Sequence, residues 1–181
     1  MKTTLIIGGA RSGKSTYAQE TARRSGKKVL FVATAEAGDE EMRQRIEKHQ
    51  QSRPAGWVTL EATDSLGSRI AAESGDAEIV IIDCVTLLVS NIFQRCGEEA
   101  DPADVEKAAR AEIDELIEGI HRVDADFLIV TNDVGLGLVP ADSVSRLYRD
   151  ILGAANQALA RHADEVVLMV AGVPVPVKTS P

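Results

Sequence analysis

The segment from Gly8 to Ser15, GGARSGKS, restricts the folds open to this chain more than any other feature. It matches the pattern G-x-x-x-x-G-K-[ST], follows an apolar stretch at 4–8 and precedes a stretch of helical character at 14–24. In that context, glycines let backbone N–H groups surround phosphates, and the start of the helix adds positive partial charge. Lys14 is expected to reach the β- and γ-phosphates of a nucleotide, and the Ser15 hydroxyl to bind Mg²⁺. The predicted phosphate-binding loop consists of Gly8, Gly9, Ala10, Arg11, Ser12, Gly13, Lys14 and Ser15.

Apolar stretches alternate with stretches of helical character along the rest of the chain. Strands are expected at 29–34, 78–83 and 127–131, a short extended piece at 57–60, and strand-like segments at 165–172 and 173–178. Helices are expected at 39–52, 65–73, 102–121 and 142–162. Strands that are apolar throughout and alternate with helices indicate a parallel sheet covered on both faces, and the prolines of the last segment suggest a sheet edge. We predict an α/β, P-loop NTPase-like three-layer fold with a mainly parallel central sheet and a C-terminal antiparallel edge.

Length and composition limit the classes of protein that fit. A chain of 181 residues is expected to form a single nucleotide-binding domain over 1–181. Its 28 acidic against 20 basic residues give a net charge of −8, which argues against a nucleic-acid binder. The two cysteines, Cys84 and Cys96, have neither metal-site spacing nor the density of a disulfide framework. No apolar run is long enough to span a membrane, so we expect a cytoplasmic protein.

A second metal ligand is expected at the end of a neighbouring apolar strand, because P-loop proteins use a carboxylate there. Asp83 closes the stretch EIVIID and fits this role, although an Asp at a strand end can also simply begin a turn. Ser15 and Asp83 together would hold one Mg²⁺. These features indicate nucleotide-dependent phosphoryl transfer or hydrolysis. A signalling GTPase is disfavoured, since 131–134 reads Thr-Asn-Asp-Val and lacks the lysine of an Asn-Lys-x-Asp guanine motif.

A histidine between two arginines follows the second expected strand. If 39–52 is a helix, Arg45, His49 and Arg53 lie on one stripe of its surface. Arg53 precedes Pro54, so the helix is expected to end there. An imidazole can attack phosphorus and form a covalent intermediate, and flanking arginines would neutralise charge on the phosphate oxygens. A surface histidine on an amphipathic helix is the alternative that spacing alone leaves open.

Four segments taken together resemble the bifunctional adenosylcobinamide kinase / adenosylcobinamide-phosphate guanylyltransferase family of cobalamin biosynthesis. They are GGARSGKS, RIEKHQQSRPAGWVTLE, TNDVGLGLVP and YRDILGAANQALARHADEVVLMVAG, and the resemblance covers essentially the whole chain. It implies phosphorylation of adenosylcobinamide with ATP or GTP. It also implies transfer of GMP from GTP to that phosphate through a guanylylated histidine, with release of pyrophosphate. The matching histidine is His49, and the family further implies a homotrimer.

The resemblance also assigns nucleotide contacts outside the phosphate-binding loop. They fall on Ala33, Thr34, Ala35, Gln50, Gln51, Ser52, Arg53, Glu61 and Asp83. One departure from the family is Asp133, where N-E-V-G is usual and this chain has N-D-V-G. A carboxylate role there is in doubt, because Asp is one methylene shorter. The kinase base therefore stays open between Glu61, Asp83 and Asp133. For Arg146, Arg149 and Asn156, on the helix that follows, contact with phosphate or with a neighbouring subunit and ordinary surface salt bridges are equally open.

Two other classes of function stay possible on the sequence. A plain P-loop small-molecule kinase would transfer only the γ-phosphate, and His49 would be incidental. A nucleotide-dependent switch or binding module would hydrolyse slowly and present its loop to a protein partner. The missing guanine motif and the arginine-flanked histidine argue against the switch. An assay with a cobinamide substrate would separate the bifunctional enzyme from both.

Overall fold

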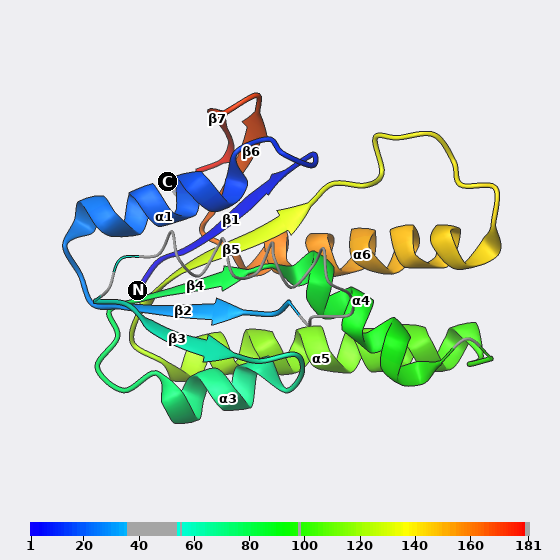
Figure 1. Cartoon of the computed structure of the whole chain (residues 1–181), viewed down its shortest axis with the longest axis horizontal. Coiled ribbons are helices and arrows are strands. Elements are labelled where there is room, and N and C mark those ends of the chain that lie inside the picture. The colour runs from blue at the N-terminus through cyan, green and yellow to red at the C-terminus, as the bar shows by residue number, and fades with distance from the viewer. Residues whose placement is uncertain (36–53, 55, 98, 180–181) are drawn as a thin grey trace.

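The computed structural model describes residues 1–35, 54, 56–97 and 99–179 of the chain. Strands and helices alternate along these parts of the sequence (Figure 1). The strands are β1 (Thr3–Gly8), β2 (Val29–Ala33), β3 (Val58–Glu61), β4 (Ile79–Asp83), β5 (Asp126–Asn132), β6 (Glu165–Val170) and β7 (Val173–Lys178). The helices are α1 (Lys14–Ser25), α3 (Leu66–Glu73), α4 (Val85–Cys96), α5 (Pro102–Arg122) and α6 (Ser143–His162). The helix expected at 39–52 lies outside the described residues.

All seven described strands form one sheet in the order β3-β2-β4-β5-β1-β6-β7. Every neighbouring pair is parallel except β6 and β7, which are antiparallel. The prolines of the last segment therefore lie on an edge strand, as predicted, where a missing N–H costs no sheet hydrogen bond. The predicted mainly parallel sheet with a C-terminal antiparallel edge is confirmed.

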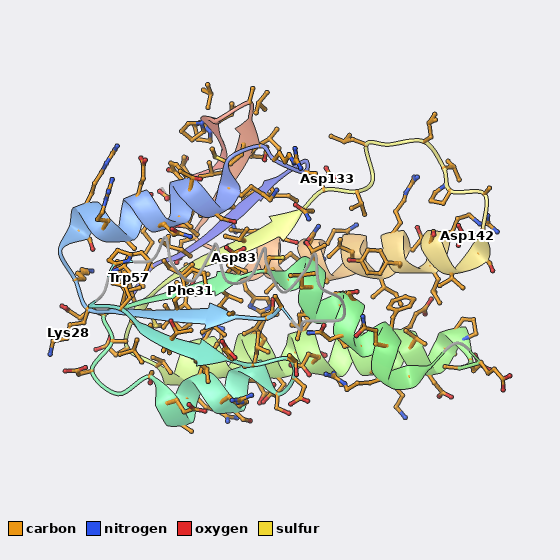
Figure 2. The ribbon with its side chains drawn as sticks, in the orientation of Figure 1. Lys28, Phe31, Trp57, Asp83, Asp133 and Asp142 are labelled. Atoms are coloured by element: carbon orange, nitrogen blue, oxygen red, sulfur yellow. The ribbon has the colours of Figure 1, made fainter. Side chains whose placement is uncertain are left out.

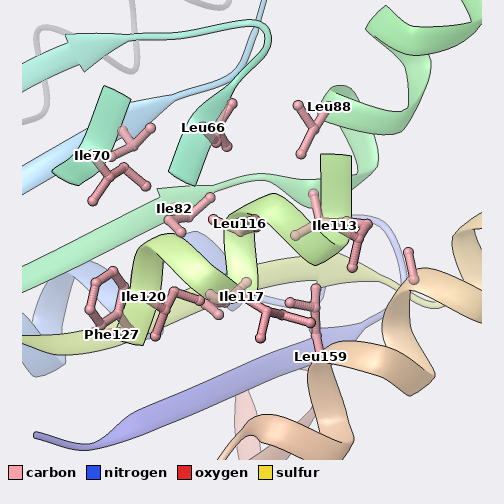
Figure 3. Packing of buried hydrophobic residues seen from close by; sticks show 14 of the residues in the cluster. Leu66, Ile70, Ile82, Leu88, Ile113, Leu116, Ile117, Ile120, Phe127 and Leu159 are labelled. Atoms are coloured by element: carbon pink, nitrogen blue, oxygen red, sulfur yellow. The ribbon is translucent and has the colours of Figure 1, made fainter. Parts of the chain in front are cut away.

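Helices cover both faces of the sheet, which confirms the three-layer arrangement (Figure 1). On one face Ala18 and Ala22 of α1 pack with apolar side chains of the strands, among them Phe31 and Ile81. The opposite face is covered by α3, α4, α5 and α6 (Figure 1). Their apolar side chains form the larger core cluster with the strands, as Figure 3 shows for Leu88, Leu116, Phe127 and others. No helix among the described residues is long and apolar enough to cross a membrane.

Helix α4 is the element that the sequence analysis missed. The apolar run Val85–Val89 directly follows the buried strand β4, and no side chain caps the helix at Cys84, so no start signal is visible. Its buried positions nevertheless include Val85, Leu88, Val89 and Ile92, the i, i+3, i+4, i+7 pattern of a helix that packs on a core. Burial of each such aliphatic side chain contributes about 1.5–3 kcal/mol.

Helices α5 and α6 begin at aspartates that cap them. Asp101 Oδ1 accepts the Ala103 N–H at 2.9 Å, and Pro102 fills the first helical position, where an N–H has no partner. Asp142 Oδ1 accepts the Ser145 N–H at 2.7 Å, and this backbone bond lowers the pKa of the Asp142 carboxyl. The predicted capped start of the helix at Pro102 is therefore confirmed.

Helices α3 and α5 cross with their backbones in close contact, because a glycine lies at the crossing on each helix. A Cβ atom at Gly119 would lie 2.3 Å from the Cα of Gly67, and one at Gly67 would lie 2.1 Å from the carbonyl oxygen of Glu115. The Glu115 carboxylate also accepts the N–H groups of Gly67 and Ser68, at 3.2 and 2.8 Å. The first turn of α3 thus obtains its hydrogen-bond acceptors from α5.

Replacing Gly119 with alanine is expected to destabilise the protein. The added methyl group would meet backbone atoms, which cannot rotate away, so the helices must separate. Overpacking of this kind costs about 3 kcal/mol of unfolding free energy. Urea unfolding followed by circular dichroism measures the loss. The matched control is Gly153→Ala on α6, where a Cβ meets nothing within 4 Å, and a gain of about 0.5–1 kcal/mol is expected. Equal effects of the two substitutions would contradict the proposed close crossing.

Candidate functional site

The parallel strands end together at one edge of the sheet, where Asp83 and Asp133 lie (Figure 2). In the strand register Gly8 lies opposite Asn132, and Asp83 lies opposite Ala33. Ala33 is in turn opposite Glu61 on β3. The end of the phosphate-binding-loop strand, the Asp83 strand end and the start of the Asn-Asp-Val-Gly segment are therefore neighbours. This is the edge at which ligands of open parallel sheets bind.

The phosphate-binding loop, Gly8–Ser15, has a backbone that requires glycine at positions 8 and 13. Gly13 has a φ of 94°, and a Cβ there would lie 3.2 Å from the Cα of Gly172. A Cβ at Gly8 would lie 2.6 Å from the carbonyl oxygen of Met169 and 2.8 Å from Ser12 Oγ. The connection between β6 and β7 also supports the loop, since the Gly172 N–H donates to the Ser12 carbonyl at 2.9 Å.

Two polar side chains of this loop are buried. The Lys14 ammonium donates to the Gly9 carbonyl at 2.6 Å, and only 7% of Lys14 is exposed. Burial lowers the pKa of Lys14, and the nearby Asp83 carboxylate partly opposes this shift. Within the described residues, Ser12 Oγ is the one buried side-chain oxygen or nitrogen without a hydrogen-bond partner. A buried hydroxyl of this kind indicates a partner outside the described residues.

The sequence predicts that Ser15 and Asp83 bind Mg²⁺. Ser15 lies in the first turn of α1, and Asp83 ends β4, two strands away from β1. No cluster of three or more metal-binding side chains occurs among the described residues. A hydroxyl and one carboxylate beside phosphates nevertheless match the usual ligands of Mg²⁺, which takes one or two carboxylates together with substrate phosphates. The donor set therefore fits a nucleotide-bound Mg²⁺.

Thr34 is held by a buried polar network that the sequence analysis did not predict. Its hydroxyl donates to the Cys84 carbonyl at 2.7 Å and accepts the Cys84 N–H at 2.8 Å. The carboxamide of Asn91, on α4, donates to the carbonyls of Thr34 and Thr63, at 2.9 and 3.3 Å. Asn91 is only 4% exposed. The segment Ala33, Thr34 and Ala35 is thereby tied to the residue that follows Asp83.

The side chain of Cys84 is a partly buried thiol next to Asp83. Burial and the neighbouring charge of Asp83 raise its pKa to about 11. A thiol with so high a pKa stays protonated at neutral pH and is a poor nucleophile. Cys84 therefore acts as a small packed side chain, and it contacts the core on the α1 side of the sheet.

Some of the remaining predicted residues lie within the described part of the chain and others lie outside it. Glu61 ends the edge strand β3 and is exposed. Trp57 stacks on Phe31 with ring centroids 6.4 Å apart and packs against the core on the α1 side of the sheet. His49, Gln50, Gln51, Ser52 and Arg53 lie outside the described residues.

The end of β5 is fixed by a second polar network, which connects three elements. Asn156 of α6 accepts from the Thr131 hydroxyl at 2.7 Å and donates to the Asn132 carbonyl at 3.0 Å. The Asn132 N–H donates to Thr86 Oγ1 at 2.9 Å, and Tyr148 donates to the Thr86 carbonyl at 2.9 Å. Asn156 therefore positions the segment that leads to Asp133. Its hydrogen bonds to Thr131 and Asn132 indicate a structural role.

Comparison with known proteins gives consistent matches over nearly the whole chain. The sequence model of the family described as cobinamide kinase / cobinamide phosphate guanyltransferase matches residues 4–177. The bifunctional adenosylcobalamin biosynthesis protein CobU of Escherichia coli (strain K12) is 42% identical over 179 residues, 96% of this chain and 98% of that protein. The CobU of Salmonella typhimurium is 41% identical over the same shares of both chains. CobP of Pseudomonas aeruginosa, with the same description, is 39% identical over 98% of both.

A likeness to a solved structure concerns the fold alone. The crystal structure of the RadB recombinase superposes with a TM-score of 0.51 at 16% sequence identity. The match covers 92% of this chain and 73% of that one. It agrees with the P-loop NTPase-like fold that the sequence predicts.

Proposed function

Because the chain belongs to the cobinamide kinase / cobinamide phosphate guanyltransferase family, we propose that it catalyses two successive reactions of cobalamin biosynthesis. In the first, a phosphoryl group passes from ATP or GTP to the aminopropanol hydroxyl of adenosylcobinamide. In the second, GMP passes from GTP to that phosphate, which gives adenosylcobinamide-GDP and pyrophosphate. The observation that carries the proposal is the family match over 4–177. A plain small-molecule kinase is not favoured, since relatives 39–42% identical are named bifunctional.

In the kinase step, the phosphate-binding loop would hold the β- and γ-phosphates of the donor. Lys14 and the backbone N–H groups around Gly13 would stabilise the negative charge on the transferred phosphoryl group. The buried hydroxyl of Ser12, without a partner among the described residues, supports this, because a phosphate oxygen would supply the missing hydrogen bond. Ser15 and Asp83 would hold Mg²⁺, which neutralises phosphate charge when bound. Glu61, Asp83 and Asp133 remain the candidates for the kinase base.

In the second step, His49 would be the nucleophile. Its imidazole attacks the α-phosphorus of GTP, the bond to the β-phosphate oxygen breaks, and pyrophosphate leaves. The phosphate of adenosylcobinamide phosphate then attacks the same phosphorus and releases the imidazole. Supporting nucleotide contacts would come from the phosphate-binding loop, from Ala33, Thr34 and Ala35, and from Gln50, Gln51, Ser52 and Arg53, with Glu61 at the edge of the site.

We further propose that the protein acts as a homotrimer in the cytoplasm. The family resemblance supports the trimer, and light scattering on the purified protein would give its mass. Both reactions consume cytoplasmic nucleotides, which supports the location. Cys84 and Cys96 are free thiols, as expected for a protein kept in a reducing compartment.

The proposed function is tested by product analysis with adenosylcobinamide. Incubation with Mg²⁺ and ATP alone is expected to give adenosylcobinamide phosphate, and incubation with GTP is expected to give adenosylcobinamide-GDP and pyrophosphate. Mass spectrometry distinguishes these products, and a reaction without nucleotide is the control. A phosphate product that never proceeds to the GDP form would indicate a plain kinase. The absence of both products would overturn the proposal.

A further inference from the structure

A cavity of about 330 Å³ lies between the start of the loop that follows β5 and the middle of α6. The loop contributes Asp133, Val134 and Gly135, and α6 contributes residues that include Arg149 and Gln157. Figure 2 shows the loop running from Asp133 at the end of β5 out to Asp142, where α6 begins. Among the described residues, none of the nucleotide contacts that the family resemblance assigns lines this cavity.

The cavity directly adjoins the phosphate-binding loop. The Asp133 N–H donates to the Gly8 carbonyl at 3.1 Å. Asp133, which lines the cavity, directly follows the end of β5, the parallel neighbour of β1. On the α6 side the wall is anchored by Asn156, whose carboxamide is bonded to Thr131 and Asn132. A ligand in this cavity would therefore lie beside the expected phosphates without competing for the groups that hold them.

The lining carries both donors and acceptors of hydrogen bonds. Asp133 and Asp150 supply carboxylates, Arg149 a guanidinium group and Gln157 a carboxamide. One Asp133 oxygen accepts the Gly135 N–H at 2.8 Å, which fixes the carboxylate at the cavity wall. A mixture of this kind suits a neutral ligand that both donates and accepts, such as a carboxamide, better than a phosphate, which would be repelled by the two carboxylates.

The loop beyond the cavity exposes large apolar side chains. Leu136, Leu138 and Val139 are 85%, 96% and 69% exposed. Adjacent exposed apolar side chains next to a polar cavity mark a surface for a ligand that has an apolar body and polar arms. A corrinoid has this chemistry, because carboxamide side chains surround a methylated macrocycle.

We propose that this cavity is the acceptor subsite, which binds carboxamide arms of the corrinoid while Leu136, Leu138 and Val139 contact its macrocycle. The inference rests on the proposed function and adds the binding site of its acceptor. The size of the cavity limits what enters. Its 330 Å³ lies at the lower end of the range for pockets that hold drug-sized ligands, roughly 300 to 1,000 Å³. A corrinoid is much larger than such a ligand, so the cavity holds arms and not the macrocycle. The aminopropanol hydroxyl is then held beside the phosphate-binding loop.

The test fills the cavity from Gly153, which lines it on α6. A Cβ at this position meets nothing within 4 Å, so Gly153→Phe adds bulk to the cavity without a backbone clash. The expected result is a rise of about 10-fold or more in KM for adenosylcobinamide, which corresponds to about 1.4 kcal/mol of lost binding. The KM for GTP is expected to stay within about 2-fold, since no phosphate contact changes. Gly153→Ala is the matched control and is expected to leave both values near wild type.

A second variant keeps the inference testable if Gly153→Phe folds poorly. Arg149→Met removes the guanidinium from the cavity wall and is expected to raise the corrinoid KM without changing the GTP KM. An unchanged corrinoid KM in a folded Gly153→Phe, or in Arg149→Met, overturns the inference while wild-type turnover leaves the proposed function intact. Failure of the wild type itself to phosphorylate adenosylcobinamide overturns the proposed function instead.

Discussion

Lys14→Ala is expected to abolish both activities while leaving the fold intact. The ammonium of Lys14 lies inside the phosphate-binding loop. In either reaction it would stabilise negative charge on the phosphate groups of the nucleotide. Removal of one such preorganised donor typically lowers kcat by about 10²–10³-fold. Stability is expected to change by no more than about 1 kcal/mol, because only the bond to Gly9 is lost and burial of the charge already lowers the pKa of Lys14.

Lys28→Ala is the matched control for this prediction. Lys28 is an exposed lysine, paired with Asp76 at the opposite end of the sheet from Asp83 (Figure 2). Its removal is expected to leave kcat and KM of both reactions unchanged. Steady-state rates for phosphate formation and GMP transfer, together with urea unfolding, separate the two variants. Retention of full guanylyl transfer by Lys14→Ala would show that the phosphate-binding loop does not hold the GTP of the second reaction.

His49→Ala is expected to abolish guanylyl transfer and preserve the kinase. With GTP labelled on the α-phosphate, wild-type protein should retain label on the denatured chain, and the variant should retain none. A phosphoramidate would lose the label in acid and keep it in base, which identifies the nucleophile as a histidine. Phosphorylation of adenosylcobinamide with ATP should continue, because the groups expected to hold that nucleotide are those of the phosphate-binding loop.

Two comparisons make the His49 experiment decisive. GTP labelled on the γ-phosphate should leave no label on either protein, since the γ-phosphate departs within pyrophosphate. His121→Ala removes a histidine of α5, 6.0 Å from His162 between ring centroids, and should label like wild type. Label that persists on His49→Ala would assign the nucleophile elsewhere, and no label on wild type despite GTP binding would favour a plain kinase.

The sequence predicted the strands and most helices because their signals are local. The continuous apolar runs that became β2, β4 and β5 are typical of buried parallel strands, and the prolines of β7 indicated an edge. Helix α4 was missed for a physical reason: it begins without a capping side chain directly after a buried strand. Its periodic apolar face was visible in the sequence but was outweighed by the β-branched and apolar character of its first turn.

The candidate site was predictable only where one motif contains the chemistry. The phosphate-binding loop and Asp83 follow from short patterns, and the resemblance supplied His49. The supporting groups were not predictable, because Thr34 and Asn91 are 57 positions apart in the sequence and meet only through the packing of α4. The same holds for the cavity beside Asp133, whose two walls come from the end of β5 and from the middle of α6.

The sheet order has a consequence for how the molecule opens. The strands that lead into the site, β4, β5 and β1, are interior strands with a hydrogen-bonded neighbour on each side. In contrast, β7 is exposed at all six positions and lies at the rim of the sheet. Backbone amides in such interior strands exchange with solvent only when most of the structure unfolds, whereas rim strands fray at little cost. The carboxyl ends of β4, β5 and β1, where the candidate site lies, therefore keep their shape while local fluctuations open the rim strand.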